Sequence, residues 1–299
     1  MNFKEKFAWY SELVDNRIKA SFCLSGTSDE ILHKAMRYSL TAGGKRIRPV
    51  LSLAVADMLG GDIEIVMPFA CALEMIHTSS LIHDDLPEMD DDDYRRGQLS
   101  NHKVFGAGMA VLAGDSLMNL SYEFISEALT GARDHIPGML KAFRIIAEST
   151  GYRGMMGGQA IDLASEGADV DFDVVKRMHK MKTGALIKAA VLSPAAIFDA
   201  NREETAALND YSEKLGLAFQ IRDDILDVTG EKAEIGKKPG GDAESGKATY
   251  MSFLGLEKSR TELSKLTAES VIDLRCFGDK AGFLVSMSEY FDMTGGRSA

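Results

Sequence analysis

The sequence predicts an all-α fold, with about a dozen helices arranged around one central cavity. Apolar residues recur at intervals of three and four in most long segments, the spacing of helix faces that pack on a core. No segment alternates apolar and polar residues as a half-buried strand does, and there is no internal repeat or heptad array. The chain has 299 residues and 45% hydrophobic content, enough for a large core, and we expect one domain over residues 1–299.

The first helices are predicted from their apolar patterns and end signals. Residues 3–23 form one amphipathic helix, and residues 27–30 offer N-cap side chains for a second helix that ends near Ser39. Residues 41–49, rich in glycine and basic residues, then break the helical pattern. Glycine at such a break allows the backbone to approach a ligand closely. An apolar helix over residues 50–59 follows.

A long central helix is predicted between Asp62 and His83. Asp62 is its N-cap candidate, and Pro68 lies in its early part. Apolar residues cover most of its faces, so we expect it to be buried. Pro87 stops the run, because proline pushes the residue before it out of the helical conformation.

The second half of the chain contains further helices separated by glycine-rich and polar segments. The glycines within residues 151–158 leave the helix boundaries between 135 and 166 undefined. Residues 182–184 are predicted to break one helical run, and residues 231–247 to form a polar loop. Helices are expected over residues 109–128, 171–182, 185–200, 202–228 and 249–267.

An acidic segment, residues 84–93, follows the central helix. If the chain curls back after Pro87, the carboxylates of Asp84 and Asp90 face one point. Converging carboxylates repel each other unless a cation lies between them, and oxygen ligands completed by substrate phosphate suit Mg²⁺. Arg95 and Arg96, just downstream, are fork-shaped donors suited to phosphate.

Two plainer interpretations compete for this segment. A charge run is often a solvated surface loop. An EF-hand calcium loop is the other, but no frame has glycine at its sixth position and glutamate at its twelfth. A second acidic segment, residues 223–227, favours the metal site: Asp223 and Asp227 share a helix face about 6 Å apart along the axis. They interrupt an apolar run, where unpaired carboxylates are rare.

Composition excludes several functional classes. The formal net charge of −11 argues against nucleic-acid binding, which needs a basic face. The three cysteines are scattered and form no Cys-x-x-Cys pair, so we expect free thiols in the cytoplasm. The N-terminus lacks the apolar stretch of a signal peptide, and no uninterrupted apolar run is long enough to predict a membrane span.

Together with Gly43-Gly44-Lys45-Arg46-Ile47-Arg48-Pro49, the two acidic segments closely resemble the motifs of trans-prenyl diphosphate synthases. The likeness runs from near Ser28 to near Arg260 and favours bacterial farnesyl and geranylgeranyl diphosphate synthases. It implies an isoprenoid-synthase-type bundle, a homodimer and a Mg²⁺-dependent enzyme. Such an enzyme ionises an allylic diphosphate, joins the cation to isopentenyl diphosphate and releases a proton, expected to go to the departing diphosphate.

The resemblance also implies a role for each candidate site residue. The expected Mg²⁺ ligands are Asp84, Asp90 and Asp223, with Asp85 and Asp227 as further candidates. The expected allylic diphosphate ligands are Arg95, Lys182 and Lys237, with Thr183 and Gln220 beside the cation. The expected isopentenyl diphosphate ligands are Lys45, Arg48, His77 and Arg96. Lys238 and Lys247 compete with Lys237, and a lone histidine such as His77 is more often a core residue.

Two rival functions fit the motifs less well. Class I terpene cyclases usually carry Asn-Asp-x-x-Ser-x-x-x-Glu, whereas Ser212 follows Asn209-Asp210 one position too early. Cyclases also lack the Gly-Gly-Lys-Arg-Ile-Arg-Pro element. Non-catalytic subunits of two-component synthases usually lose aspartates from the first acidic segment, which this chain keeps. Many relatives end in a tyrosine followed by a short basic tail. Here residues 290–299 contain a single basic residue, Arg297.

Product length is predicted from Ser79, which lies a little over one turn before Asp84 in the path of the growing chain. Related farnesyl synthases usually have an aromatic floor there, and a serine leaves the space open. The next floor would be Met75 or Ile76, about 5–6 Å deeper, which favours geranylgeranyl over farnesyl diphosphate. Alternatively, Ser79 only packs against small residues of the 108–116 segment and another side chain sets the floor.

Overall fold

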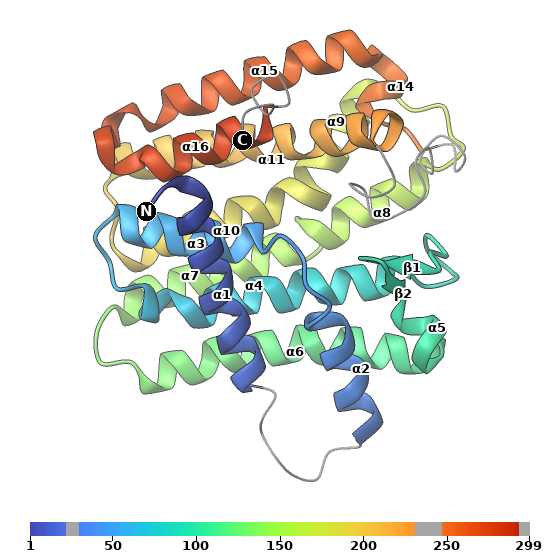
Figure 1. The fold of residues 1–299 in the computed structure, drawn as a ribbon, viewed down its shortest axis with the longest axis horizontal. Coiled ribbons are helices and arrows are strands. Elements are labelled where there is room, and N and C mark those ends of the chain that lie inside the picture. The colour runs from blue at the N-terminus through green and yellow to red at the C-terminus, as the bar shows by residue number, and fades with distance from the viewer. Residues whose placement is uncertain (22–29, 231–246, 293–299) are drawn as a thin grey trace. The chain divides into compact units, whose positions relative to one another are not determined.

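The computed structural model describes residues 1–21, 30–230 and 247–292, and Figure 1 shows its helices. The predicted all-α class is confirmed. The one exception in the described ranges is a hairpin of β1 (Tyr94–Arg95) and β2 (Gln98–Leu99), antiparallel with Tyr94 opposite Leu99. Strands of two residues are too short to give an alternating pattern. Several predictions concern residues outside the described ranges: Cys23, the N-cap candidates 27–29, Lys237, the loop 231–246 and Arg297.

The chain folds into two compact units. Unit 1 comprises Met1–Leu53 and Asp62–Ile136, and unit 2 comprises Ala54–Gly61 and Pro137–Ala299. The expectation of a single domain over the whole chain stays a prediction.

Unit 1 is built around two long helices that pack along each other, α4 and α6 (Figure 1). Its elements are α1 (Phe3–Ser21), α2 (Glu30–Leu40), the first half of α3 (Ile47–Met58), α4 (Ile63–Asp84), β1, β2, α5 (Asn101–Phe105) and α6 (Ala107–Gly131). Gly114 of α6 lies against the His83 ring, so closely that a Cβ would collide with the imidazole. The His83 Nε2 atom also lies 3.2 Å from the Val111 carbonyl oxygen. A small residue at this position therefore allows α6 to pack closely on α4.

Helix α4 has the predicted ends and the predicted burial. The Asp62 carboxylate accepts from the Glu64 N–H at 2.9 Å, and the helix ends at Asp84. It is the single described helix long and apolar enough to cross a membrane, but 72% of that apolar window is buried in the protein. Glu74 and His77 interrupt its apolar run, so the sequence does not predict a membrane span there. Its composition is that of a core helix.

Unit 2 packs α11 along α15 and α10 (Figure 1). Its elements are α7 (Ile136–Thr150), α8 (Met155–Ser165), α9 (Phe172–His179), η1 (Lys180–Gly184), α10 (Ala185–Ile197), α11 (Arg202–Thr229), α14 (Tyr250–Leu254), α15 (Leu256–Asp273), η2 (Leu274–Ala281) and α16 (Gly282–Phe291). A capping box starts α11: Asn201 accepts from the Glu204 N–H, and the Glu204 carboxylate accepts from the Asn201 N–H. The predicted α11 is confirmed to within a residue of its end.

Some predicted boundaries were wrong. Helix α3 begins at Ile47 and takes Pro49 into its first turn, where proline's missing N–H has no helical partner to lose. The run predicted over 249–267 divides at Gly255, whose φ of 72° ends one helix and starts another. The predicted break at residues 182–184 is instead a π-helical turn, η1, which continues α9 into α10.

Candidate active site

The loop after α4 curls back, as the sequence predicts. The Asp90 N–H donates to the Asp84 carbonyl oxygen at 2.9 Å, which places the backbones of the two predicted metal ligands side by side. The N–H groups of Met89 and Asp91 donate to the Leu86 carbonyl oxygen at 2.9 and 3.0 Å. Asp91 has a φ of 47°, the left-handed conformation that aspartate tolerates better than most residues. The loop therefore forms a closed backbone turn at the end of a rigid helix.

The remaining aspartates of this loop are paired with bases. The buried Asp85 carboxylate accepts from Nε of Arg95 at 2.8 Å and from its Nη2, and the same Nη2 lies 3.1 Å from Asp92. Asp93 pairs with Lys103 at 2.7 Å. Burial raises the pKa of Asp85 to about 6, although Arg95 acts in the opposite direction. The sequence made Asp85 a candidate metal ligand, but in this structure its carboxylate binds the Arg95 guanidinium.

The second acidic segment lies on α11, and its three aspartates differ. Asp223 is exposed, whereas Asp224 and Asp227 are buried. Asp224 accepts from the Gln220 Nε2 amide at 2.9 Å and from the Tyr250 N–H at 2.9 Å. It therefore ties the start of α14 to α11. The sequence does not reveal this role, because a contact between residues 224 and 250 leaves no local pattern.

The π-helical turn η1 carries two predicted substrate residues. The Lys182 Nζ donates to Asp162 of α8 at 2.6 Å, and Thr183 Oγ1 donates to Gln220 Oε1 at 2.7 Å. Thr183 and Gln220, predicted to lie beside the same cation, are therefore in contact. Gly158 of α8 has no room for a Cβ, because the Lys182 backbone occupies that position. The glycines that obscured the helix boundaries thus allow α8 to approach η1.

A basic cluster gathers in unit 1 from the residues predicted to bind isopentenyl diphosphate. Arg48 is buried, and burial lowers its pKa to about 10. His77 is half-buried, and its pKa is well below its ordinary value because of burial first and then of Arg48, Arg96 and other arginines. Its imidazole is therefore neutral near pH 7. Lys45 is exposed on the loop before α3.

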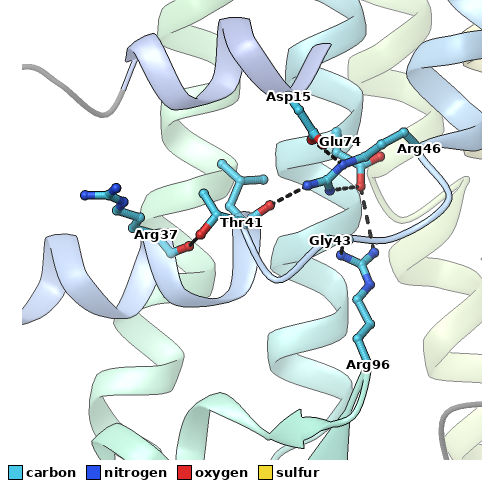
Figure 2. Close-up of polar contacts among 8 residues, drawn as sticks. Asp15, Arg37, Thr41, Gly43, Arg46, Glu74 and Arg96 are labelled. Carbon is cyan, nitrogen blue, oxygen red and sulfur yellow. Dashed lines mark hydrogen bonds and ion pairs between the residues drawn. The ribbon is translucent and has the colours of Figure 1, made fainter. Parts of the chain in front are cut away.

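Arg46 and Glu74 are buried charges that the sequence analysis did not single out. Figure 2 shows Arg46 donating from Nη1 to Glu74 at 2.6 Å and from Nε to Asp15 at 2.8 Å. Its Nη2 donates to the Leu40 carbonyl oxygen at 2.8 Å. Glu74 is a carboxylate in the middle of an otherwise apolar helix, and that was the available signal.

Two findings bear on the metal and on product length. In the described part of the chain, no group of three or more His, Cys, Asp or Glu side chains is placed to hold a metal ion. Ser79 is fully buried, and its hydroxyl has no hydrogen-bond partner among the described residues. Met75 and Ile76, one turn earlier, are also fully buried.

Comparison with known proteins decides the family. The polyprenyl synthetase family profile matches residues 29–274. The chain belongs to this family. It is 44% identical to a dimethylallyltranstransferase of Fischerella ambigua, over 97% of this chain and 83% of the relative. It is 41% identical to a geranylgeranyl diphosphate synthase of Cyanophora paradoxa, over 93% and 92% of the two chains.

A solved structure agrees with the family. The crystal structure of an FPP/GFPP synthase from Zymomonas mobilis aligns with a TM-score of 0.84, at 36% identity, over 97% of this chain and 98% of the other. The resemblance inferred from the three motifs and the helical fold that it implied are both confirmed. At the level of the family, so is the predicted function, short-chain trans-prenyl diphosphate synthesis by a prenyltransferase.

Proposed function

We propose that this prenyltransferase condenses an allylic diphosphate with isopentenyl diphosphate and that its main product is geranylgeranyl diphosphate. One observation carries the proposal: Arg48 of α3, His77 of α4 and Arg96 of the turn between β1 and β2 gather in one basic cluster. His77 precedes Asp84 by seven residues, about 10 Å along the helix axis. Helix α4 thus carries both His77 of this cluster and the start of the acidic loop.

The acidic loop fits Mg²⁺ by its donor set and its backbone. Its donors are carboxylate oxygens, and the Asp90–Asp84 backbone hydrogen bond holds the two proposed ligands together. Mg²⁺ takes one or two carboxylates and fills its other positions with water and substrate phosphate, so a dedicated group of three acids is not required. We assign Asp84, Asp90 and Asp223 as its ligands. When bound, Mg²⁺ would neutralise the leaving diphosphate.

The residues of η1 and α11 orient groups toward the allylic cation. The Gln220 amide can give Asp224 only its N–H, so its oxygen points to Thr183. Thr183 donates its proton to that oxygen, and its own lone pairs are then available to a positive charge. Lys182, held by Asp162, and Arg95, held by Asp85, would bind the allylic diphosphate.

The isopentenyl diphosphate half would be bound by Lys45, Arg48, His77 and Arg96. A neutral His77 can accept or donate a hydrogen bond without adding a further charge to the arginines. The resemblance also supports a homodimer acting in the cytoplasm, and sedimentation of the purified protein would measure the first of these.

The test is product analysis with isopentenyl diphosphate and each allylic primer, by chromatography of the dephosphorylated product. We expect diphosphate release that requires isopentenyl diphosphate. Release without it would indicate a cyclase and contradict the proposal, and no release by the purified protein would indicate a non-catalytic subunit.

Product length is tested at Ser79. We expect a twenty-carbon product from the wild type and a fifteen-carbon product from Ser79→Phe, because an aromatic ring would close the space below the metals. Thr78→Val is the matched control, since it alters a neighbouring buried hydroxyl without adding bulk. The full burial of Ser79 also fits the interpretation that it only packs against α6. The same product from the wild type and Ser79→Phe would establish that interpretation.

A further inference from the structure

Glu74 is the buried carboxylate of helix α4, and only 1% of its surface is exposed. A buried charge is costly unless it is paired and hydrogen-bonded. Glu74 is not among the metal or substrate ligands assigned above. Its role must therefore follow from the side chains that it contacts.

Glu74 faces two arginines with one carboxylate oxygen. Oε1 accepts from Arg46 Nη1 at 2.6 Å and lies 3.8 Å from Arg96 Nη2, an arrangement drawn in Figure 2. Asp15 also binds Arg46, through Nε at 2.8 Å, but its side chain is 34% exposed. The two carboxylates thus share one arginine, and Glu74 alone of the two pairs with Arg96 in this structure.

Arg96 is held from the opposite side by the loop before α3. Its Nη1 donates to the Gly43 carbonyl oxygen. At Gly44 a Cβ would lie 2.6 Å from the Arg96 Cζ, so the guanidinium lies directly on the glycine backbone. The guanidinium is therefore fixed between the Gly43–Gly44 backbone and the Glu74 carboxylate.

We propose that Glu74 is a positioning residue: its buried carboxylate holds Arg96 against the Gly43–Gly44 backbone, in the arrangement that binds isopentenyl diphosphate. The inference rests on the proposed function, which places Arg96 in that half of the site. Without the carboxylate, Arg46, Arg48 and Arg96 would repel one another. Arg96 has a side chain 20% exposed, against 2% for Arg46, so it is the one that would move into solvent.

The test is Glu74→Gln, which keeps the shape and one hydrogen-bond acceptor but removes the charge. We expect the KM for isopentenyl diphosphate to rise about tenfold, the effect of losing one charged hydrogen bond between Arg96 and the diphosphate. The KM for the allylic diphosphate and the kcat should change less than about twofold. Asp15→Asn is the matched control, because it weakens the other Arg46 pair without touching Arg96, and it should leave both KM values unchanged.

A double-mutant cycle with Arg96→Ala shows whether Glu74 acts through Arg96. Glu74→Gln should add no further rise in the isopentenyl diphosphate KM when Arg96 is already absent. An additive effect, an equal rise in both KM values or a tighter binding of isopentenyl diphosphate would each overturn the inference. If Arg96→Ala itself leaves that KM unchanged, the assignment of Arg96 in the proposed function is wrong, and this inference is overturned with it.

A second variant covers the outcome that Glu74→Gln does not fold. Glu74→Asp keeps the charge and withdraws the carboxylate by one methylene, about 1.5 Å, from both arginines. We expect it to raise the isopentenyl diphosphate KM selectively, and again not in the Arg96→Ala background. Thermal unfolding of each variant is recorded alongside. A folded Glu74→Asp with both KM values at the wild-type level would contradict the inference.

Discussion

The two acidic segments use their inner aspartates differently. In the loop after α4, Asp85 and Asp93 pair with the charged side chains of Arg95 and Lys103. In α11, Asp224 accepts from two neutral donors, the Gln220 amide and a backbone N–H. An ion pair brings two charges into contact, whereas a hydrogen bond from an amide N–H to a carboxylate involves only one. The contacts of the first segment are thus ion pairs, and the contact of Asp224 with the Tyr250 N–H ties α14 to α11.

The comparison shows that adjacent aspartates are not equivalent. Each segment combines a residue assigned to the metal with a neighbour that holds local structure: Asp84 beside Asp85, and Asp223 beside Asp224. Substituting the first kind should reduce catalysis with little loss of stability, and substituting Asp224 should do the reverse. The predictions below separate these two kinds of residue.

The largest effect is expected from Asp84→Ala. Turnover should fall by at least about 10²–10³, the usual cost of removing one charge-stabilising contact in the transition state. Chelation of the wild type should abolish activity, and Mg²⁺ should restore it. Asp93→Asn is the control within the loop, because it alters an exposed ion pair and should change turnover little. Near-normal turnover of Asp84→Ala would remove that residue from the metal site.

The two diphosphate sites should separate by their Michaelis constants. Arg96→Ala should raise the KM for isopentenyl diphosphate about 10–100-fold and that for the allylic substrate much less, because one charged donor is lost on one side only. Lys182→Ala should do the opposite. Steady-state kinetics with each substrate varied in turn measures both. Equal changes in the two constants would refute the division of the site.

A smaller effect concerns the pH dependence of stability. Asp85 binds its proton more tightly in the folded protein, since its pKa rises from 3.8 to about 6. Between these values the folded state carries more protons than the unfolded state, so the free energy of unfolding falls as pH rises from about 4 to about 6. The full loss is at most about 3 kcal/mol. Urea unfolding of the wild type and Asp85→Asn should show that the variant lacks this slope, and identical slopes would contradict it.

Local signals made part of the fold predictable. Asp62 and Pro87 marked the ends of α4, and the apolar spacing of residues 202–228 marked α11. The π-helical turn Lys180–Gly184 was not predictable, because one extra residue in a turn barely alters the apolar spacing. In this turn the Lys182 backbone packs closely on Gly158 of α8, a residue 24 positions earlier.

The candidate site was predictable where the motif itself carries the chemistry. The curl of the acidic loop followed from Pro87. The resemblance placed Thr183 and Gln220 beside the same cation, and the structure shows them in contact. The arrangement of Arg46 with Glu74 joins residues 28 apart, and no local pattern encodes it. Which aspartates face a base was also hidden, since Arg95 lies on a hairpin that the sequence did not reveal and Lys103 lies on the short helix α5.

The most direct measurement compares Asp223→Asn with Asp224→Asn, two neighbouring positions changed in the same way. Asp223→Asn should lower kcat by about 10²–10³ and leave the thermal unfolding temperature unchanged. Asp224→Asn should lower the free energy of unfolding by about 1–3 kcal/mol, because the new amide must place an N–H against one of two donors. Its remaining folded fraction should keep most of its turnover. A loss of stability in Asp223→Asn with full turnover, or the same profile in both variants, would contradict the division of roles.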